Sequence, residues 1–121
     1  MAHSNTWEDA GLYRVFKDKI SDDEVLKSNL SIQGDERFDC IKYVINDFTK
    51  MTDFEISDTG IHKIAAIDNV AAISNPNIKI AIVSTHEVFL SWVSLYVETM
   101  KGSPFECQIF DDVDSAYDWA L

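Results

Sequence analysis

The sequence predicts an α/β domain with a mainly parallel sheet of four or five strands and helices on its faces. Two observations support this. The β-branched run over residues 78–83 is almost uncharged, which is typical of a strand covered on both faces. An amphipathic segment follows it at once, opened by Ser84 and Glu87, and a helix directly after a buried strand is the βα unit of a parallel sheet.

The length and composition indicate one small globular domain. The chain has 121 residues, of which 46% are hydrophobic and 26% charged. This is the ordinary mixture of a domain that buries its own core. We therefore expect a single domain over residues 1–121.

The charge balance excludes two classes of partner. Lysine and arginine number 10 against 21 aspartates and glutamates, a net charge of -11. Such a chain repels phosphate backbones and anionic lipid surfaces, so we expect neither nucleic acid nor membrane as a partner. The start of the chain lacks a basic segment followed by an apolar one, and no apolar run approaches the ~20 residues of a membrane span, so we expect a cytoplasmic protein.

The N-terminal third reads as a hairpin followed by a helix. Residues 12–16 alternate as a strand does, and we expect them to pair with part of His3–Glu8. A capping box then runs from Ser21 to Glu24, because the serine oxygen can accept from a free amide while the glutamate reaches back. The helix it opens should extend to about Ile32.

The middle of the chain reads as a second βα unit. Residues 40–48 are rich in β-branched and aromatic side chains and predict a core strand, with a loop or short edge piece over residues 49–57. Asp58 or Thr59 can then cap a helix whose apolar side chains cover most of its circumference. Pro76 ends it, because proline cannot extend the helical amide ladder.

The C-terminal third repeats the pattern. Residues 84–87 form a second capping box, and the helix it opens should end near residues 102–104. Residues 105–110 read as the last strand. Asp111 or Asp112 then caps a final helix.

A polar rim is the first candidate site. Parallel strands place their carboxyl ends on one edge of a sheet, where open α/β sheets tend to bind ligands. Carboxylates beside a histidine could hold a divalent cation or perform acid–base chemistry, although several of these residues are equally explained as helix caps. The rim residues are Asp47, Ser84, Thr85, His86, Asp111 and Asp112.

Other chemistry lacks its motif. The chain contains neither a Gly-x-Ser-x-Gly elbow nor a glycine-rich turn that would cradle phosphates, and no cofactor is predicted. A phosphoacceptor receiver domain would need an acidic pair after the first strand and a lysine after the last. Residues 17–19 are Lys-Asp-Lys and residues 111–112 are two aspartates, so that class is excluded.

The order of the elements and several local segments resemble a family of small uncharacterised bacterial proteins with the SpoIIAA-like fold. The resemblance covers nearly the whole chain and implies a (βα)n superhelix. That fold is shared with the STAS domains of sulphate transporters and anti-sigma factor antagonists and with the CRAL-TRIO lipid carriers. The segments are residues 11–16, 35–39, 43–48, 75–76, 81–83 and 116–119.

The resemblance also implies a candidate phospho-switch. STAS antagonists carry an Asp-Ser-Ser-Gly-Leu type motif whose serine is phosphorylated by a partner kinase. Residues 57–61, Ser-Asp-Thr-Gly-Ile, are similar but lack the second serine. Ser57 and Thr59 are therefore the candidate phosphorylation sites, and an ordinary helix cap is the alternative.

Two classes of function are left open, with enzyme activity at the rim a weaker third. The leading hypothesis is a non-catalytic, STAS-like regulatory module that binds a protein partner or itself as a homodimer, because Val88, Leu95 and Val97 add apolar surface to the third helix. The alternative is a carrier or sensor of a small apolar ligand, in a pocket lined by the second and third helices. Its walls would include Phe89, Trp92, Tyr96 and Met100.

Overall fold

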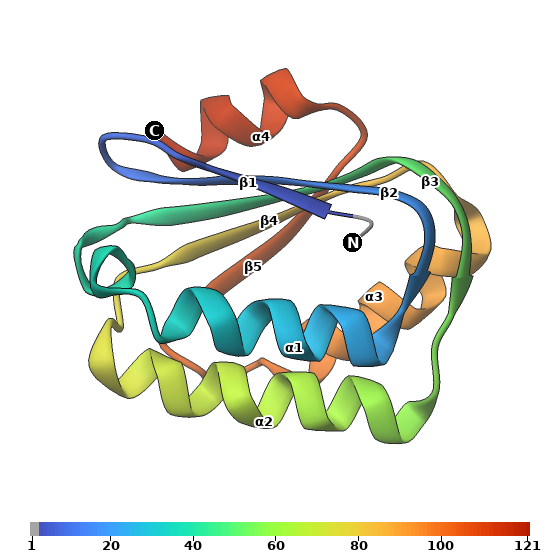
Figure 1. The fold of residues 1–121 in the computed structure, drawn as a ribbon, viewed down its shortest axis with the longest axis horizontal. Coiled ribbons are helices and arrows are strands. Elements are labelled where there is room, and N and C mark those ends of the chain that lie inside the picture. Colours follow the sequence, from blue (N-terminus) through green and yellow to red (C-terminus); the bar gives the residue numbers. More distant parts are fainter. Residues whose placement is uncertain (1–2) are drawn as a thin grey trace.

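The computed structural model describes residues 3–121, so Met1 and Ala2 of the N-terminal stretch considered above lie outside it. Its five strands form one sheet in the order β1-β2-β3-β4-β5, in which β1 is antiparallel to β2 and the other pairs are parallel (Figure 1). The strands are β1 His3–Trp7, β2 Gly11–Ser21, β3 Tyr43–Glu55, β4 Lys79–Val83 and β5 Glu106–Phe110. The helices are α1 Asp22–Gln33, the 3-10 helix η1 Glu36–Cys40, α2 Asp58–Ser74, α3 Glu87–Thr99 and α4 Val113–Ala120. The predicted α/β class, the mainly parallel sheet and the N-terminal hairpin are confirmed.

The helices cover the two faces of the sheet unequally. Helices α1, α2 and α3 lie on one face, while α4 lies on the other (Figure 1). Successive side chains of the central strands pack on opposite faces of the sheet. Val44 and Ile80 belong to the larger apolar cluster, and Ile45 and Ala81 belong to the smaller cluster beside α4. Strands buried on both faces explain the nearly uncharged run over residues 78–83. Within residues 3–121, no helix combines the length and hydropathy needed to cross a membrane.

Strands β2 and β3 are longer than predicted and form a two-stranded arm beyond the rest of the sheet. Of the two alternatives predicted for residues 49–57, a loop or a short edge piece, the loop is wrong, because β3 continues to Glu55. It pairs there with the second half of β2, from Lys17 opposite Lys50 to Ser21 opposite Glu55. Irregular register near Asp18, which has a φ of 62°, lets the arm bend toward the helices (Figure 1). The start of β3 also differs, since the strand begins at Tyr43 rather than at Cys40, which is the last residue of η1.

Two helix starts agree with the sequence. The Oγ of Ser21 accepts from the Glu24 amide at 3.1 Å and begins α1. The carboxylate of Asp112 accepts from the Ser115 amide at 2.7 Å and begins α4. Each side chain satisfies an amide that has no partner within its helix, which is why these sequences start helices.

Two other helix starts are shifted by one or two residues. Helix α2 is capped by Ser57, whose Oγ accepts from the Gly60 amide at 3.0 Å, rather than by the two residues that follow. Helix α3 is capped by His86, whose Nδ1 accepts from the Phe89 amide at 3.2 Å. Ser84 instead accepts from the amide of His86 at 3.2 Å, so it holds the turn before the helix.

The start of α2 packs closely against the start of α1, and this contact predicts a sensitivity at Gly60. A Cβ added there would lie 1.9 Å from Oδ2 and 2.7 Å from Cβ of Asp22. We expect Gly60→Ala to lower the free energy of unfolding in urea by about 1–3 kcal/mol, the usual cost of overpacking. Gly34→Ala is the matched control, because an added Cβ there meets nothing closer than 3.6 Å. Equal stability of the two variants would contradict the close approach.

Candidate functional site

A buried arginine lies between the sheet and the helices. Arg14, in β2, is 2% exposed. Its Nη1 donates to the Oδ1 atoms of Asn29 and Asn46 at 2.8 and 3.1 Å, and its Nη2 donates to the Oγ of Ser28 at 2.5 Å. Burial lowers the pKa of Arg14 to about 10, which still leaves it charged at neutral pH. Helix α1 therefore turns two polar side chains inward to solvate this charge.

A buried carboxylate lies across the same layer, on α2. Asp68 is 3% exposed and accepts from the Tyr96 hydroxyl at 2.6 Å, from Nε2 of Gln33 at 2.8 Å and from Nδ2 of Asn29 at 3.2 Å. Burial raises the pKa of Asp68, while these donors and the charge of Arg14 act against the rise. Asn29 thus joins the two opposite charges through one amide group.

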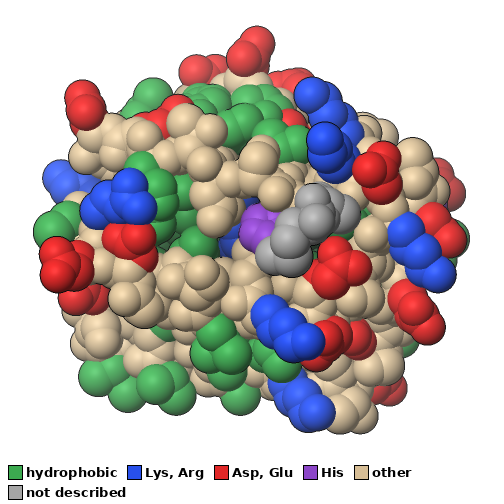
Figure 2. All heavy atoms as spheres, viewed as in Figure 1, with side chains coloured by type: hydrophobic (Ala, Val, Ile, Leu, Met, Phe, Trp, Pro, Cys, Tyr) green, Lys and Arg blue, Asp and Glu red, His purple; other side chains and the backbone are tan. Residues whose placement is uncertain are grey.

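A cavity of about 90 Å³ lies beside these polar groups, between the sheet and α1, α2 and α3. For comparison, an engineered apolar cavity of about 150 Å³ binds benzene, so this one has room for a few waters or a small organic molecule. It is not sealed, and Figure 2 shows a hollow between β1 and α1 with basic side-chain atoms at its bottom. Arg14, Asn29, Asn46 and Asp68 line the cavity together with mainly apolar side chains that include Phe16, Val44, Ile64, Ile80, Ile82, Phe89, Val93 and Tyr96.

One hydrogen-bond donor at this cavity has no acceptor. Among the buried side-chain nitrogen and oxygen atoms of residues 3–121, only Nε of Arg14 lacks a hydrogen-bond partner. A buried unsatisfied donor costs about 1–3 kcal/mol, so it is rarely kept without a reason. The cavity therefore offers the Nε–H group of Arg14 to a ligand or a water, in a wall that is mainly apolar.

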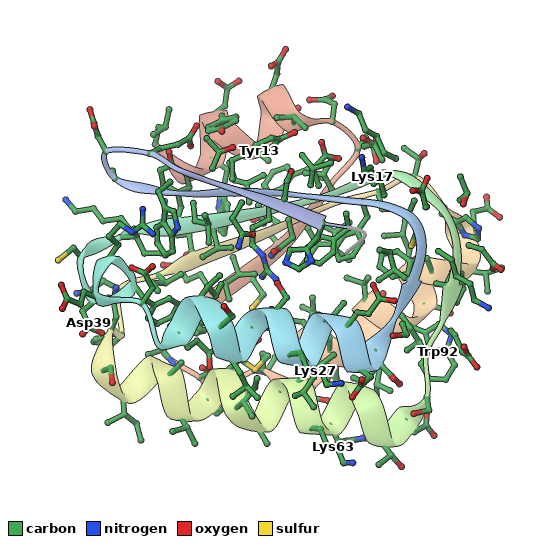
Figure 3. All side chains as sticks on the ribbon, viewed as in Figure 1. Tyr13, Lys17, Lys27, Asp39, Lys63 and Trp92 are labelled. Carbon is green, nitrogen blue, oxygen red and sulfur yellow. The ribbon has the colours of Figure 1, made fainter. Side chains whose placement is uncertain are left out.

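The apolar residues proposed from the sequence are mostly found at this cavity. Phe89, Trp92 and Tyr96 line it, and Trp92 projects from α3 in Figure 3. Met100 is buried at the end of α3 but does not line the cavity. The sequence placed the pocket between the second and third helices, whereas α1 and the sheet contribute as much of the wall.

The register places the rim residues along one edge, because Asp47 pairs with Val83, the residue before Ser84, and Val83 pairs with Phe110, the residue before Asp111. Because β3 continues for eight residues beyond it, Asp47 lies within a strand rather than at a strand end. It is 3% exposed and accepts from the Tyr13 hydroxyl at 2.5 Å and from the amide and hydroxyl of Thr49 at 2.9 and 2.7 Å. These bonds occupy both of its oxygens.

The other rim residues lie in the turns before α3 and α4 and at the starts of these helices. Thr85 and Asp111 are exposed, while Ser84, His86 and Asp112 make the bonds to helix starts described above. No group of three or more histidine, cysteine, aspartate or glutamate side chains within residues 3–121 is placed to hold a metal ion. The geometry gives the rim a structural role at α3 and α4.

The fold has a counterpart among solved structures. An uncharacterised protein of the DUF3478 family with a SpoIIAA-like fold, from Shewanella loihica PV-4, superposes with a TM-score of 0.59, covering 99% of this chain and 93% of that one. The fold is SpoIIAA-like. The predicted resemblance is thereby confirmed for the fold, and at 15% identity the similarity extends no further. No family model and no curated protein sequence matches the chain.

Within this SpoIIAA-like fold the two candidate phosphorylation sites lie at the start of α2. Ser57 and Thr59 are both exposed. Ser57 donates its amide and its hydroxyl to Oδ2 of Asp22, each at 2.9 Å. A phosphate on Ser57 would gain from the helix N-terminus but would meet this carboxylate. The phospho-switch remains a prediction.

A tyrosine cluster on the α4 face was not anticipated from the sequence. Glu8 accepts from the hydroxyls of Tyr43 at 2.6 Å and Tyr117 at 2.9 Å, and the ring of Tyr13 stacks on that of Tyr117 with centroids 6.1 Å apart. Figure 3 shows Tyr13 between the sheet and α4. The residues are far apart in sequence, so no local pattern indicated that they meet.

The tyrosines give a direct test of the SpoIIAA-like packing. Burial is the largest cause that raises the pKa of the four tyrosines, Tyr13, Tyr43, Tyr96 and Tyr117, and the pKa of Tyr43 rises to about 12. The next causes are nearby carboxylates for Tyr13, Tyr43 and Tyr117, and Asp68 and Cys107 for Tyr96. Because the neutral phenols are favoured in the fold, their stabilisation is complete below pH ~10 and is lost as pH rises toward about 12. We expect tyrosinate absorbance at 295 nm to appear only above pH ~11, together with unfolding, whereas urea-unfolded chain should titrate near pH ~10. A native titration near pH ~10 would show that the cluster is open.

Proposed function

We propose that this protein is a non-catalytic carrier or sensor that binds a small, mainly apolar molecule in the cavity between its sheet and α1, α2 and α3. The observation that supports this most is the unpartnered Nε of Arg14, buried beside a space of about 90 Å³ with largely apolar walls. Ligand sites in proteins commonly combine apolar walls with a few placed polar groups. The proposal takes up the second of the two functions expected from the sequence.

The buried charges also favour a binding role over a purely structural one. Replacing a buried ion pair with well-packed apolar residues is often neutral or stabilising, so a core built only for stability does not need Arg14 and Asp68. A fold that keeps both, and leaves one donor without a partner, departs from the rules of an ordinary core at this place. Such departures concentrate at functional sites.

Xenon tests the cavity itself. We expect xenon dissolved under pressure to shift the methyl NMR signals of Val44, Ile64 and Val93, which line the cavity. Val93→Phe should abolish these shifts by filling the space. Val88→Phe is the matched control, because Val88 lies on the same helix and is 60% exposed. Methyl signals unmoved by xenon in the unmodified protein would refute an open cavity. Native mass spectrometry of freshly purified protein should then reveal any retained ligand.

A second candidate function is the leading hypothesis from the sequence, a module that binds a protein partner or a second copy of itself. The exposed apolar side chains favour α1 and α2 rather than α3 as its surface. Leu30, Val70 and Ile73 are 51%, 67% and 82% exposed, and Figure 2 shows hydrophobic side chains along the lower edge of the molecule, over α1 and α2. On α3, Leu95 and Val97 pack in part against the core, which leaves Val88 exposed.

Light scattering at increasing protein concentration tests the homodimer. We expect the average mass of the unmodified protein to rise toward that of a dimer. Ile73→Lys should remove this rise and Val88→Lys should leave it unchanged, because only the lysine at position 73 would enter an interface formed by α1 and α2. A constant monomer mass at high concentration would refute the homodimer. If only Val88→Lys abolished the rise in mass, the interface would lie on α3 instead.

The proposed setting is the cytoplasm, as expected from the sequence. Both cysteines, Cys40 and Cys107, are free thiols, which suits a reducing compartment. The net charge of -11 continues to argue against nucleic acid and anionic lipid surfaces as partners.

A further inference from the structure

The buried charges at the cavity are already balanced. One buried cation, Arg14, and one buried carboxylate, Asp68, line it, and Asn29 bridges them by accepting from the first and donating to the second. The second carboxylate in the wall, Asp22, is half-buried and accepts two hydrogen bonds from Ser57. Asp68 is surrounded by donors only, from Tyr96, Gln33 and Asn29, which is the environment of an ionised carboxylate. A charged ligand would therefore add an uncompensated charge to a buried site, which is costly.

Most of the hydrogen-bonding capacity of Arg14 is also used. Its bonds to Asn29, Asn46 and Ser28 take three of the five N–H groups, and Nε is the one nitrogen of the guanidinium that donates to nothing. A ligand that accepts one hydrogen bond would satisfy this donor. A pure hydrocarbon would leave it unsatisfied and would displace any water that served it.

From these two properties we propose that the ligand is a small, uncharged, mainly apolar molecule with a single hydrogen-bond acceptor, such as an aliphatic carbonyl compound, whose oxygen accepts from Nε–H of Arg14. The proposal rests on the proposed function and adds the ligand's chemical class. The apolar part would lie against side chains such as Ile64, Phe89 and Val93. The size of the cavity, about 90 Å³, suits a ligand of about five non-hydrogen atoms or one whose chain leaves by the opening, since benzene needs about 150 Å³.

Three probes of one shape separate the ligand classes. In 2-butanone the carbonyl oxygen can accept, in 2-methyl-1-butene a methylene group replaces that oxygen, and in propanoate a charged oxygen replaces a methyl group. Each is titrated into ¹⁵N-labelled full-length protein while the Nε–H signal of Arg14 is followed by NMR. The chain has two arginines, so the variant Arg37→Lys assigns the signal.

We expect 2-butanone to bind at least tenfold more tightly than the other two probes and to move the Arg14 Nε–H proton downfield. Val93→Phe should abolish this binding, while Val88→Phe should retain it. Tighter binding of propanoate would overturn the uncharged class, and equal binding of ketone and alkene with the Nε–H signal unmoved would overturn the role of the donor.

Xenon distinguishes this inference from the proposed function. If xenon enters the cavity but none of the three probes binds, the open cavity is supported and the proposed ligand class is refuted. If neither xenon nor any probe enters, both the ligand class and the proposed carrier or sensor function are refuted.

Discussion

Arg14→Met is expected to destabilise the protein by about 3–5 kcal/mol, the usual cost of breaking a buried charge pair by removing one partner. The variant removes the only cation within residues 3–121 that lines the cavity and leaves Asp68 as an uncompensated buried carboxylate. It also leaves Asn29, Asn46 and Ser28 without the donor that they now accept from. Urea unfolding followed by circular dichroism measures the loss.

The destabilisation should depend on pH in a defined direction. Asp68 has a raised pKa in the fold, so its burial favours the protonated form, and the associated stability is present at low pH and lost as pH rises through the folded-state pKa. Arg14 holds that pKa down. Without Arg14 the pKa rises further, so the deficit of Arg14→Met should be largest at neutral pH and should narrow on acidification.

Arg37→Met is the matched control for the loss of an arginine. Arg37 pairs with Asp35 at 2.7 Å, but both side chains are substantially exposed, at 58% and 30%. Exposed pairs contribute little, so we expect almost no change in stability. If Arg14→Met were as mild as this control, the buried network would contribute little to stability, and the buried charges would not support a functional cavity.

The alternation of strands and helices could be predicted because its signals are local. The buried run over residues 78–83 and the caps at Ser21 and Asp112 depend on neighbours within a few residues. The β2–β3 arm could not be predicted in the same way. Residues 49–55 alternate with many polar side chains, and they form a strand because residues 17–21, some thirty positions earlier, pair with them.

The buried charges left a signal in the sequence that was not used. Arg14 stands between Leu12 and Phe16 on one face of a strand, and all three are at most 2% exposed. Asp68 follows Ile61, Ile64 and Ala65 at helical spacing on the buried face of α2. A charged residue on a core-facing stripe points to a buried polar network. The sequence does not show that these two charges belong together, because packing of α1 against both elements makes the connection.

The ring of Phe89 is the second position where a large effect is expected. Phe89 is 3% exposed, lines the cavity and has ring centroids 4.8 Å from Phe48 and 5.5 Å from Phe54. We expect Phe89→Ala to lower the free energy of unfolding by about 3–5 kcal/mol, which is typical when a buried aromatic ring is removed. Val88→Ala, one residue earlier and 60% exposed, should stay within about 0.5 kcal/mol.

The same substitution should change what the cavity accepts. Removing the Phe89 ring joins its volume to the existing space of about 90 Å³, which should bring the cavity to the size that holds benzene, about 150 Å³. Benzene near saturation should therefore raise the melting temperature of Phe89→Ala and leave that of the unmodified protein unchanged, because a ligand stabilises only the folded state that binds it. Were benzene to have no effect on Phe89→Ala, the helices would have collapsed onto the vacated space, and the cavity would not be the rigid, pre-formed site that a carrier or sensor of small molecules requires.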